Sequence, residues 1–117
     1  MKLFNEARLL RILIGESDKY QGKPLYQVIV ERARERELAG ATVVRGYLGF
    51  GANSRIHSAR ILRLSEDLPM VIEIVDEPER IAAFVEELDG IITEGLVTLE
   101  KVEVAMYRHN TDGSSSD

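Results

Sequence analysis

The chain has 117 residues, of which 44% are hydrophobic and 30% charged, values typical of a single globular domain that can bury a core. Its formal net charge of -5 argues against binding duplex nucleic acid, which needs a concentrated Lys/Arg surface. The absence of cysteine excludes disulfides, thiolate catalysis and Cys-ligated zinc. No early apolar run could span a membrane or serve as a signal sequence, so we expect a cytoplasmic protein.

Residues Ala7–Gly15 predict the first strand, because apolar residues alternate there and a glycine ends the run. The apolar side carries Leu10, Ile12 and Ile14. We expect Arg8 and Arg11 to mark an edge of this strand. Glu16 and Asp18 follow, preferably as the capped end of the strand, or else as ligands for a cation or as a contact for a loop of a neighbouring chain.

A polar connector leads from this strand to the first helix. Asp18 and Gly22 favour turns in it, and the proline that follows suits the first turn of a helix. Residues Pro24–Ala39 have helical spacing, with Gly40 as the predicted C-cap. We expect the charged residues 31–37 to form a solvated face with i,i+4 ion pairs.

The second strand is predicted over Ala41–Leu48, and a long connection rich in Gly, Ser, Asn, Arg and His joins it to the third strand. Because a two-residue turn can join antiparallel strands, about twenty residues are more than a hairpin needs. Long loops on a rigid scaffold often bind a ligand or a partner. Within this connection, Ser58–Leu64 is compatible with a short strand or with a helical turn.

Residues Met70–Val75 predict the third strand, which leads directly into a second helix. Asp76 is the predicted N-cap, Pro78 opens the helix, and its apolar stripe continues to Leu88. A turn then precedes the last strand, which is predicted over Leu96–Tyr107.

The order of elements is β-α-β-β-α-β, which indicates an α+β fold of the ferredoxin-like class, with two helices on one face of a four-stranded antiparallel sheet. This domain is expected to span residues 1–108, followed by a disordered polar tail of residues 109–117. Because all four strands carry apolar residues on both faces, we expect other copies of the chain to cover the open sheet face.

Two patterns near the long connection favour the binding of an anion. Gly49 and Gly51 allow backbone N–H groups to approach a phosphate, although they equally allow a kink where the strand ends. Arginines also gather here in an acidic chain, namely Arg45, Arg55, Arg60 and Arg63.

Other kinds of site are not expected. His57 has no second histidine at metal-ligand spacing, so we predict no metal site. No nucleophile and general base converge in the sequence, so we predict no enzyme.

Several stretches resemble a known family. The GFG of Gly49–Gly51, the long loop, LPMVIEIVD, and the DGIITEG that precedes VEVAMYR resemble the PII-like signalling proteins. The opening KLFNEARLLRILIGE and the central IHSARILRLSEDLPMVIEIVD are similar to a bacterial and archaeal PII-like group, domain of unknown function 190. The resemblance covers nearly the whole chain apart from the tail, and it is more specific for that group than for nitrogen-regulatory PII.

The resemblance implies a homotrimer whose sheets pack around the threefold axis, with a nucleotide in each cleft between subunits. Its T-loop base would be Gly49, Phe50 and Gly51, and its second phosphate-approaching loop would run from Gly90 to Gly95. The third strand, near Glu73 to Val75, would contact the base of the nucleotide.

The chain departs from PII in its cations. PII has a lysine directly after the second glycine turn, where this chain has Leu96. Two arginines near the end of the last PII strand align with Tyr107 and His109, which leaves Arg108 between them as the candidate ligand residue. No tyrosine matches the uridylylation target of PII, so the resemblance does not imply that covalent switch.

Two functions are compatible with these residues. The first is a non-enzymatic trimeric sensor that binds ATP, ADP or AMP through Arg45 and the glycine turns and presents its loop to a partner protein, such as a membrane transporter. The loop residues expected to meet that partner are Asn53, Arg55, His57 and Arg60. The alternative is a ferredoxin-like oligomeric module that binds a metal or an anion, or only another protein, without nucleotide.

Overall fold

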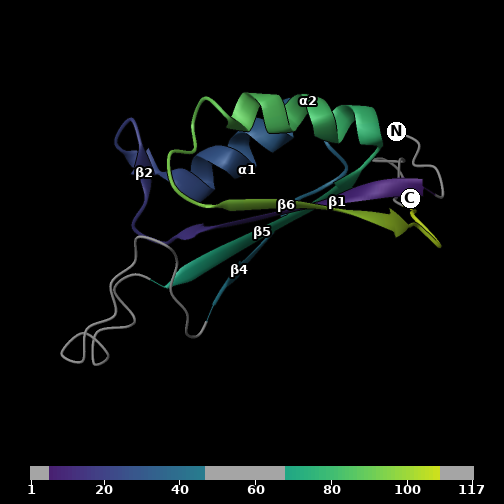
Figure 1. Ribbon diagram of the computed structural model, residues 1–117, viewed down its shortest axis with the longest axis horizontal. Coiled ribbons are helices and arrows are strands. Elements are labelled where there is room, and N and C mark those ends of the chain that lie inside the picture. Colours follow the sequence, from purple (N-terminus) through teal and green to yellow (C-terminus); the bar gives the residue numbers. More distant parts are fainter. Residues whose placement is uncertain (1–5, 47–67, 109–117) are drawn as a thin grey trace, which may run out of the picture.

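The computed structural model describes residues 6–46 and 68–108 (Figure 1). In chain order the elements are β1 (Glu6–Gly15), β2 (Lys19–Tyr20), β3 (Lys23–Pro24), α1 (Leu25–Glu35), β4 (Thr42–Arg45), β5 (Pro69–Asp76), α2 (Pro78–Leu88) and β6 (Leu96–Glu103). The expected strand or turn at Ser58–Leu64 and the expected tail at 109–117 lie outside the described residues.

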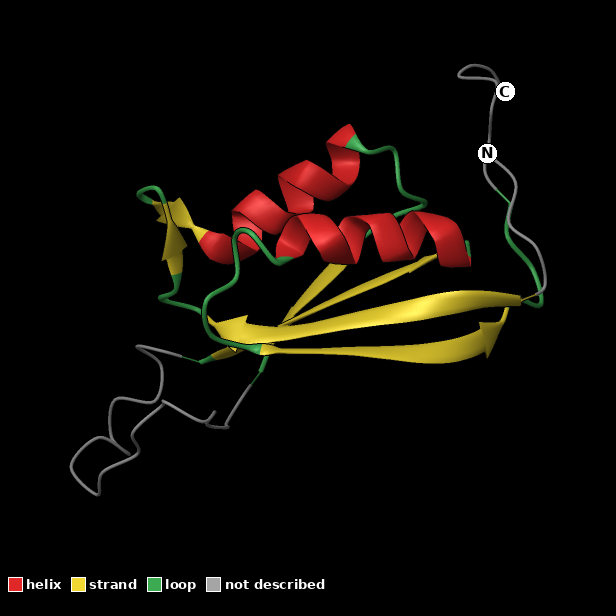
Figure 2. Cartoon of the chain, turned by 45° about the horizontal axis from the view of Figure 1, so that its top comes forward, coloured by secondary structure: helices red, strands yellow, loops and turns green. Residues whose placement is uncertain are grey.

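Four strands form one antiparallel sheet in the order β4-β5-β1-β6. Gly15 of β1 pairs with Pro69 of β5, and Glu6 at the other end of β1 pairs with Glu103 of β6. Both helices cover the same face of this sheet and leave the other face open (Figure 2). The fold is therefore α+β, and its strand order is consistent with the predicted ferredoxin-like class.

The core lies between the sheet and the helices. In β5 buried and partly exposed residues alternate strictly, and the buried residues of β1 and β5 pack against the apolar stripes of α1 and α2. The largest fully buried apolar side chains are Leu10, Ile12, Ile29, Ile72, Ile74, Ile81 and Phe84. Since burying one such side chain contributes about 1.5–3 kcal/mol, this layer holds the sheet and both helices together.

The open face carries apolar residues, as predicted, but a polar row interrupts them. Cross-strand pairing aligns one apolar row over all four strands, formed by Val44, Val71, Leu13 and Leu96. The neighbouring row is polar and consists of Thr42, Glu73, Arg11 and Thr98. The prediction that Arg8 and Arg11 mark an edge is wrong, because β1 lies inside the sheet and Arg11 occupies the centre of its open face.

The predicted polar connector contains a small hairpin that the sequence pattern did not predict. β2 and β3 pair around Gln21 and Gly22, which have φ values of 51° and 83°, and two-residue hairpin turns favour such positive φ angles. The turn role of Asp18 is confirmed, because its carboxylate accepts a hydrogen bond from the Gly15 N–H at 2.9 Å. Strands of two residues are too short to produce an alternating pattern in the sequence.

The prediction that Gly40 caps the first helix is wrong. The helix ends earlier in a Schellman motif, where the Leu38 N–H donates to the Ala33 carbonyl at 3.1 Å and the Glu37 N–H donates to the Arg34 carbonyl at 3.0 Å. Glu37 takes the left-handed position of this motif, with φ 58°. Leu38 then packs against the core, and this burial favours the early end of the helix.

Asp76 is not the N-cap of the second helix. The cap position is Glu77, whose side chain makes no capping hydrogen bond, and a proline opens the helix as predicted. Asp76 is the last residue of β5 and is wholly buried. Its carboxylate accepts hydrogen bonds from the Ala39 N–H at 2.8 Å, the Glu77 N–H at 2.6 Å and the Arg80 Nε at 3.1 Å. Because a buried carboxylate needs such partners, Asp76 joins β5 to α2 and to the segment after α1.

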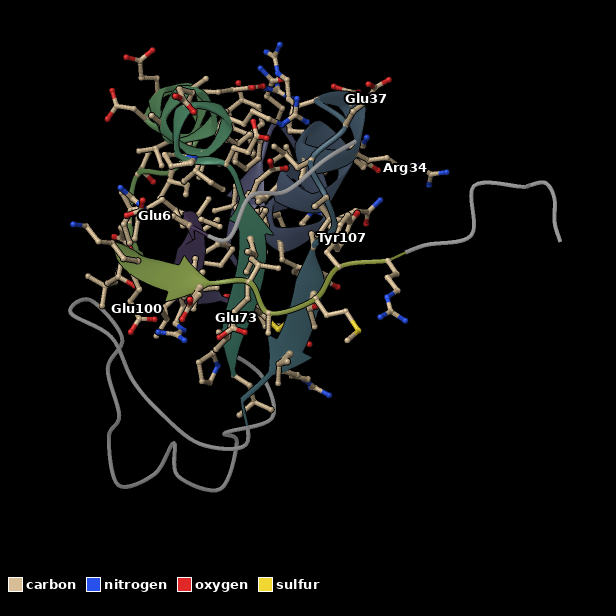
Figure 3. All side chains as sticks on the ribbon, turned by 90° about the vertical axis from the view of Figure 1, so that its right-hand side faces the viewer. Glu6, Arg34, Glu37, Glu73, Glu100 and Tyr107 are labelled. Atoms are coloured by element: carbon tan, nitrogen blue, oxygen red, sulfur yellow. The ribbon has the colours of Figure 1, made fainter. Side chains whose placement is uncertain are left out.

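The second and last strands are shorter than predicted. β6 ends at Glu103, which pairs with Glu6, the first described residue of β1. Beyond this point the chain turns toward the end of α1, where the Tyr107 hydroxyl donates to the Ala39 carbonyl at 3.4 Å (Figure 3). In β4 the paired residues are Thr42–Arg45.

Replacing Glu37 with glycine is expected to stabilise the protein by about 1 kcal/mol, because glycine adopts positive φ without the steric penalty of a Cβ. Urea unfolding followed by circular dichroism measures the change. Arg34→Gly is the matched control, since Arg34 lies within the helix, and it is expected to cost about 1 kcal/mol. A loss of stability in both variants would contradict the left-handed conformation of Glu37.

Candidate functional site

The first of the residues predicted to bind an anion lies at the end of the sheet where β4 leads into the long connection. Arg45 is the last residue of β4, and its guanidinium lies 3.2 Å from a carboxylate oxygen of Glu16. The Glu16 N–H donates to the Leu68 carbonyl at 2.8 Å, and the Gly46 N–H donates to the Pro69 carbonyl at 2.6 Å. The residues before and after the connection are therefore both held at this end of the sheet.

Three glycines near this end have different roles. A Cβ at Gly46 would lie 2.5 Å from Cγ of Pro69, so the close approach of these two residues requires glycine. Gly95 has φ 151°, and a Cβ there would lie 2.9 Å from the Leu13 carbonyl oxygen, so this turn also requires glycine. At Gly90 the nearest contact of a Cβ would be an ordinary 3.6 Å. Gly95 thus has a packing role that explains its presence without a ligand.

Glu73 and Val75 lie on the open face of β5. Glu73 accepts a hydrogen bond from Arg11 Nε at 2.9 Å, and the same guanidinium lies 3.4 Å from Glu100. Figure 3 shows Glu73 and Glu100 on the side of the sheet opposite the helices. The hydrogen bond with Glu73, supported by the charge of Glu100, raises the pKa of Arg11 against the opposing effect of burial. Glu73 is therefore already paired within its own chain.

Arg108 follows β6 near the opposite end of the sheet, beyond the pairing of Glu6 with Glu103. The eight residues of β6 span about 26 Å at the usual rise of a strand. Arg45 and Gly95 thus lie at one end of the sheet and Arg108 follows the other, so a single chain does not bring them together. A ligand that contacts both groups must lie between two chains.

The remaining predicted site residues lie outside the described residues. They are Gly49, Phe50, Gly51, Asn53, Arg55, His57 and Arg60. In the ranges 6–46 and 68–108, no group of three or more His, Asp or Glu side chains could hold a metal ion. No helix in these ranges is long and apolar enough to cross a lipid bilayer.

The charged face of α1 differs from the prediction, because its main ion pairs connect two helices. Arg32 and Arg36 both contact the Glu87 carboxylate of α2, at 2.8 Å and 2.7 Å. Arg80 of α2 in turn donates to the carbonyls of Arg36 and Glu37 after the end of α1. The spacing of four residues between Arg32 and Arg36, on the flank of an amphipathic helix, is the sequence signal that could have indicated this arrangement.

A cleft with a volume of about 300 Å³ lies beside these ion pairs. Its lining residues are Arg36, Leu38, Arg80, Ala83, Phe84 and Glu87. Phe84 is buried and Leu38 is partly buried, so the cleft combines two guanidinium groups with an apolar surface. The sequence does not predict this cleft, because none of its lining residues stands in a recognisable motif.

Residues 7–104 match the sequence profile of the family described as an uncharacterized ACR, domain of unknown function 190 (DUF190). The chain belongs to the DUF190 family. A UPF0166 protein of Aquifex aeolicus is 46% identical to this DUF190 chain over 99 residues, which cover 85% of the chain and 93% of the relative. A UPF0166 protein of Methanocaldococcus jannaschii is 33% identical over 100 residues, covering 85% and 92%.

The family match confirms the resemblance to domain of unknown function 190 that the opening and central stretches indicated. The match of residues 7–104 extends from β1 to just after β6. The relatives carry the family name alone, so the relationship of this DUF190 protein to PII stays a prediction.

Glu87 is expected to make the stability of the DUF190 protein depend on pH. The hydrogen bond from Arg36 lowers the pKa of Glu87 below its ordinary value of 4.5, and Arg32 adds to this effect against the influence of burial. A carboxyl group with a lowered pKa in the folded state stabilises the protein above its unfolded pKa, and this contribution is lost as the pH falls through the folded value.

Glu87→Gln should therefore lower the free energy of unfolding by roughly 2 kcal/mol at neutral pH, a figure that is discounted for the exposure of Arg36. The loss should become progressively smaller as the pH falls below about 4.5. Urea unfolding at pH 7 and near pH 3 measures both free energies. Glu86→Gln is the control, because Glu86 is exposed and should show no change at either pH. An equal loss for Glu87→Gln at both pH values would contradict the ion-pair origin of the effect.

Proposed function

We propose that this DUF190 protein is a non-enzymatic signalling protein of the PII-like type, which forms a trimer and binds an adenine nucleotide between subunits. The observation that carries this proposal is that the predicted ligand residues lie far apart. Arg45 and Gly95 lie at one end of the sheet, and Arg108 follows the other end. A site that uses both groups needs two chains. The resemblance of the glycine turns to those of PII supports the same arrangement.

The open sheet face supports self-association. Its apolar row is continuous across four strands, and the two outer members, Val44 and Leu96, expose 52% and 56% of their surface. Large contiguous apolar patches are rare on monomers. Arg11 is already paired with Glu73 inside its own chain, which lowers the cost of placing this charge at an interface.

The end of the sheet near Arg45 suits a ligand that acts on the long connection. A phosphate would compete with Glu16 for the Arg45 guanidinium, since both are anionic oxygen groups. Both flanks of the connection are held at this end. Binding there would shift the connection between states and so change the surface presented to a membrane transporter or a regulatory protein.

Size-exclusion chromatography with light scattering is expected to give about three times the chain mass of 13.2 kDa. Val71→Asp places a carboxylate in the apolar row of the open face and should reduce the particle to the monomer, because burying an unpaired charge is costly. Ala82→Asp, at an exposed position of α2, should leave the trimer intact. A monomer mass for the natural sequence would contradict the trimer and remove the site between subunits.

Thermal-shift measurements against ATP, ADP, AMP and cyclic AMP test the effector. At a hundredfold excess over Kd, a ligand that binds only the folded state stabilises it by about 2.7 kcal/mol, so the Tm should rise with at least one of these nucleotides. Arg45→Ala should abolish the rise, and Arg34→Ala, an exposed arginine of α1, should retain it.

The absence of a shift with every nucleotide would contradict the proposal and favour a module that binds a metal, another anion or only a protein. Turnover of ATP would contradict the non-enzymatic part of it.

A further inference from the structure

A second candidate site lies on the helix side of the fold, separate from the proposed effector site. It is the cleft of about 300 Å³ between α2 and the end of α1. Both helices lie on the covered face of the sheet (Figure 2), whereas the proposed effector residues lie at the ends of the sheet and on its open face. The volume is at the lower end of the range for small-molecule sites.

The two arginines of the cleft keep hydrogen-bond donors for a ligand. Arg36 uses Nε to bind Glu87 at 2.7 Å, and Arg80 uses Nε to bind Asp76 at 3.1 Å and Nη2 to bind the carbonyls after α1. Within residues 6–46 and 68–108, the Arg36 Nη atoms and the Arg80 Nη1 have no hydrogen-bond partner. Both guanidinium groups are thus oriented by the protein and still have N–H groups that can bind a carboxylate.

The carboxylates bound to these arginines are already paired. The guanidinium groups of Arg32, Arg36 and Arg80 face the carboxylates of Glu87 and Asp76, and the charge of Glu35 also acts on Arg36. Glu87 is bound by two of the arginines, and the buried Asp76 accepts three hydrogen bonds. Each carboxylate of the cluster is therefore already paired.

The apolar lining decides the class of anion. Leu38 and the exposed Ala83 supply apolar surface, whereas Phe84 exposes only 2% of its own, and the small side chain of Ala83 keeps the cleft open. An inorganic ion would leave this surface in contact with water, whereas an apolar group would cover it. The volume fits a small molecule better than a segment of a partner protein. We propose that the cleft binds a small organic carboxylate, whose charge pairs with Arg36 and Arg80 and whose apolar group packs on Leu38 and Ala83.

Benzoate is a suitable probe, and titration of the full chain followed by amide chemical shifts measures its binding. Ala83→Phe fills the cleft without removing a charge and is expected to weaken binding at least about tenfold. Ala82→Phe is the matched control, because it places the same side chain on the neighbouring exposed position outside the lining, and it should leave binding unchanged. Arg36→Ala should also weaken binding at least about tenfold, and Arg36→Lys should restore part of it.

Equal binding of benzoate by the Ala83→Phe and unsubstituted chains would overturn the proposal. Inorganic phosphate that binds as tightly as benzoate would overturn the role of the apolar surface, and binding of an acidic peptide without benzoate would assign the cleft to a protein partner instead. Arg45→Ala separates this site from the proposed nucleotide site, since it should leave the affinity for benzoate unchanged.

Discussion

The fold depends on the packing of alternate apolar residues of β1 and β5 against the two helices. Ile12 and Ile72, which pair across these strands, are wholly buried beneath the helices. Because side chains of a strand alternate between its two faces, burial of Ile12 forces Arg11 and Leu13 onto the open face. The same constraint places Glu73 beside Arg11. The surface on which we base self-association is therefore a direct consequence of how the core is packed.

A second, polar constraint holds the ends of the elements. The buried Asp76 carboxylate accepts hydrogen bonds from the segment after α1, from the start of α2 and from Arg80, which itself binds the carbonyls at the end of α1. Glu87 adds a bridge between the helices through Arg32 and Arg36. This network satisfies groups that the helix ends would leave without partners, and it orients the two arginines of the cleft.

These constraints separate the two regions that we propose as ligand sites. The ends and open face of the sheet hold Arg45, Gly95, Glu73 and Arg108, which only an assembly of chains can bring together. The cleft between the helices is complete within one chain. A protein of the proposed PII-like type would thus have one site that exists only after assembly and a second that does not depend on it, and the two would respond to chemically different anions.

The sequence by itself determined the elements with strong periodicity. β1, β5 and α2 were predicted to within a residue at each end, because their apolar patterns are long and bounded by glycine, proline or acidic residues. The local turn at Asp18 was also predictable, since that hydrogen bond joins residues three apart. The tertiary structure alone decided that α1 ends before Gly40, that Asp76 is buried, and that Arg11 lies at the centre of a sheet face. For Asp76 and Arg11 the deciding partners are distant in the chain, namely Ala39 and Glu73. For α1 the burial of Leu38 against the core acts together with hydrogen bonds in the last turn. Patterns in the sequence indicate which side of a helix or strand is apolar. Strand register and helix packing determine which side chains come into contact.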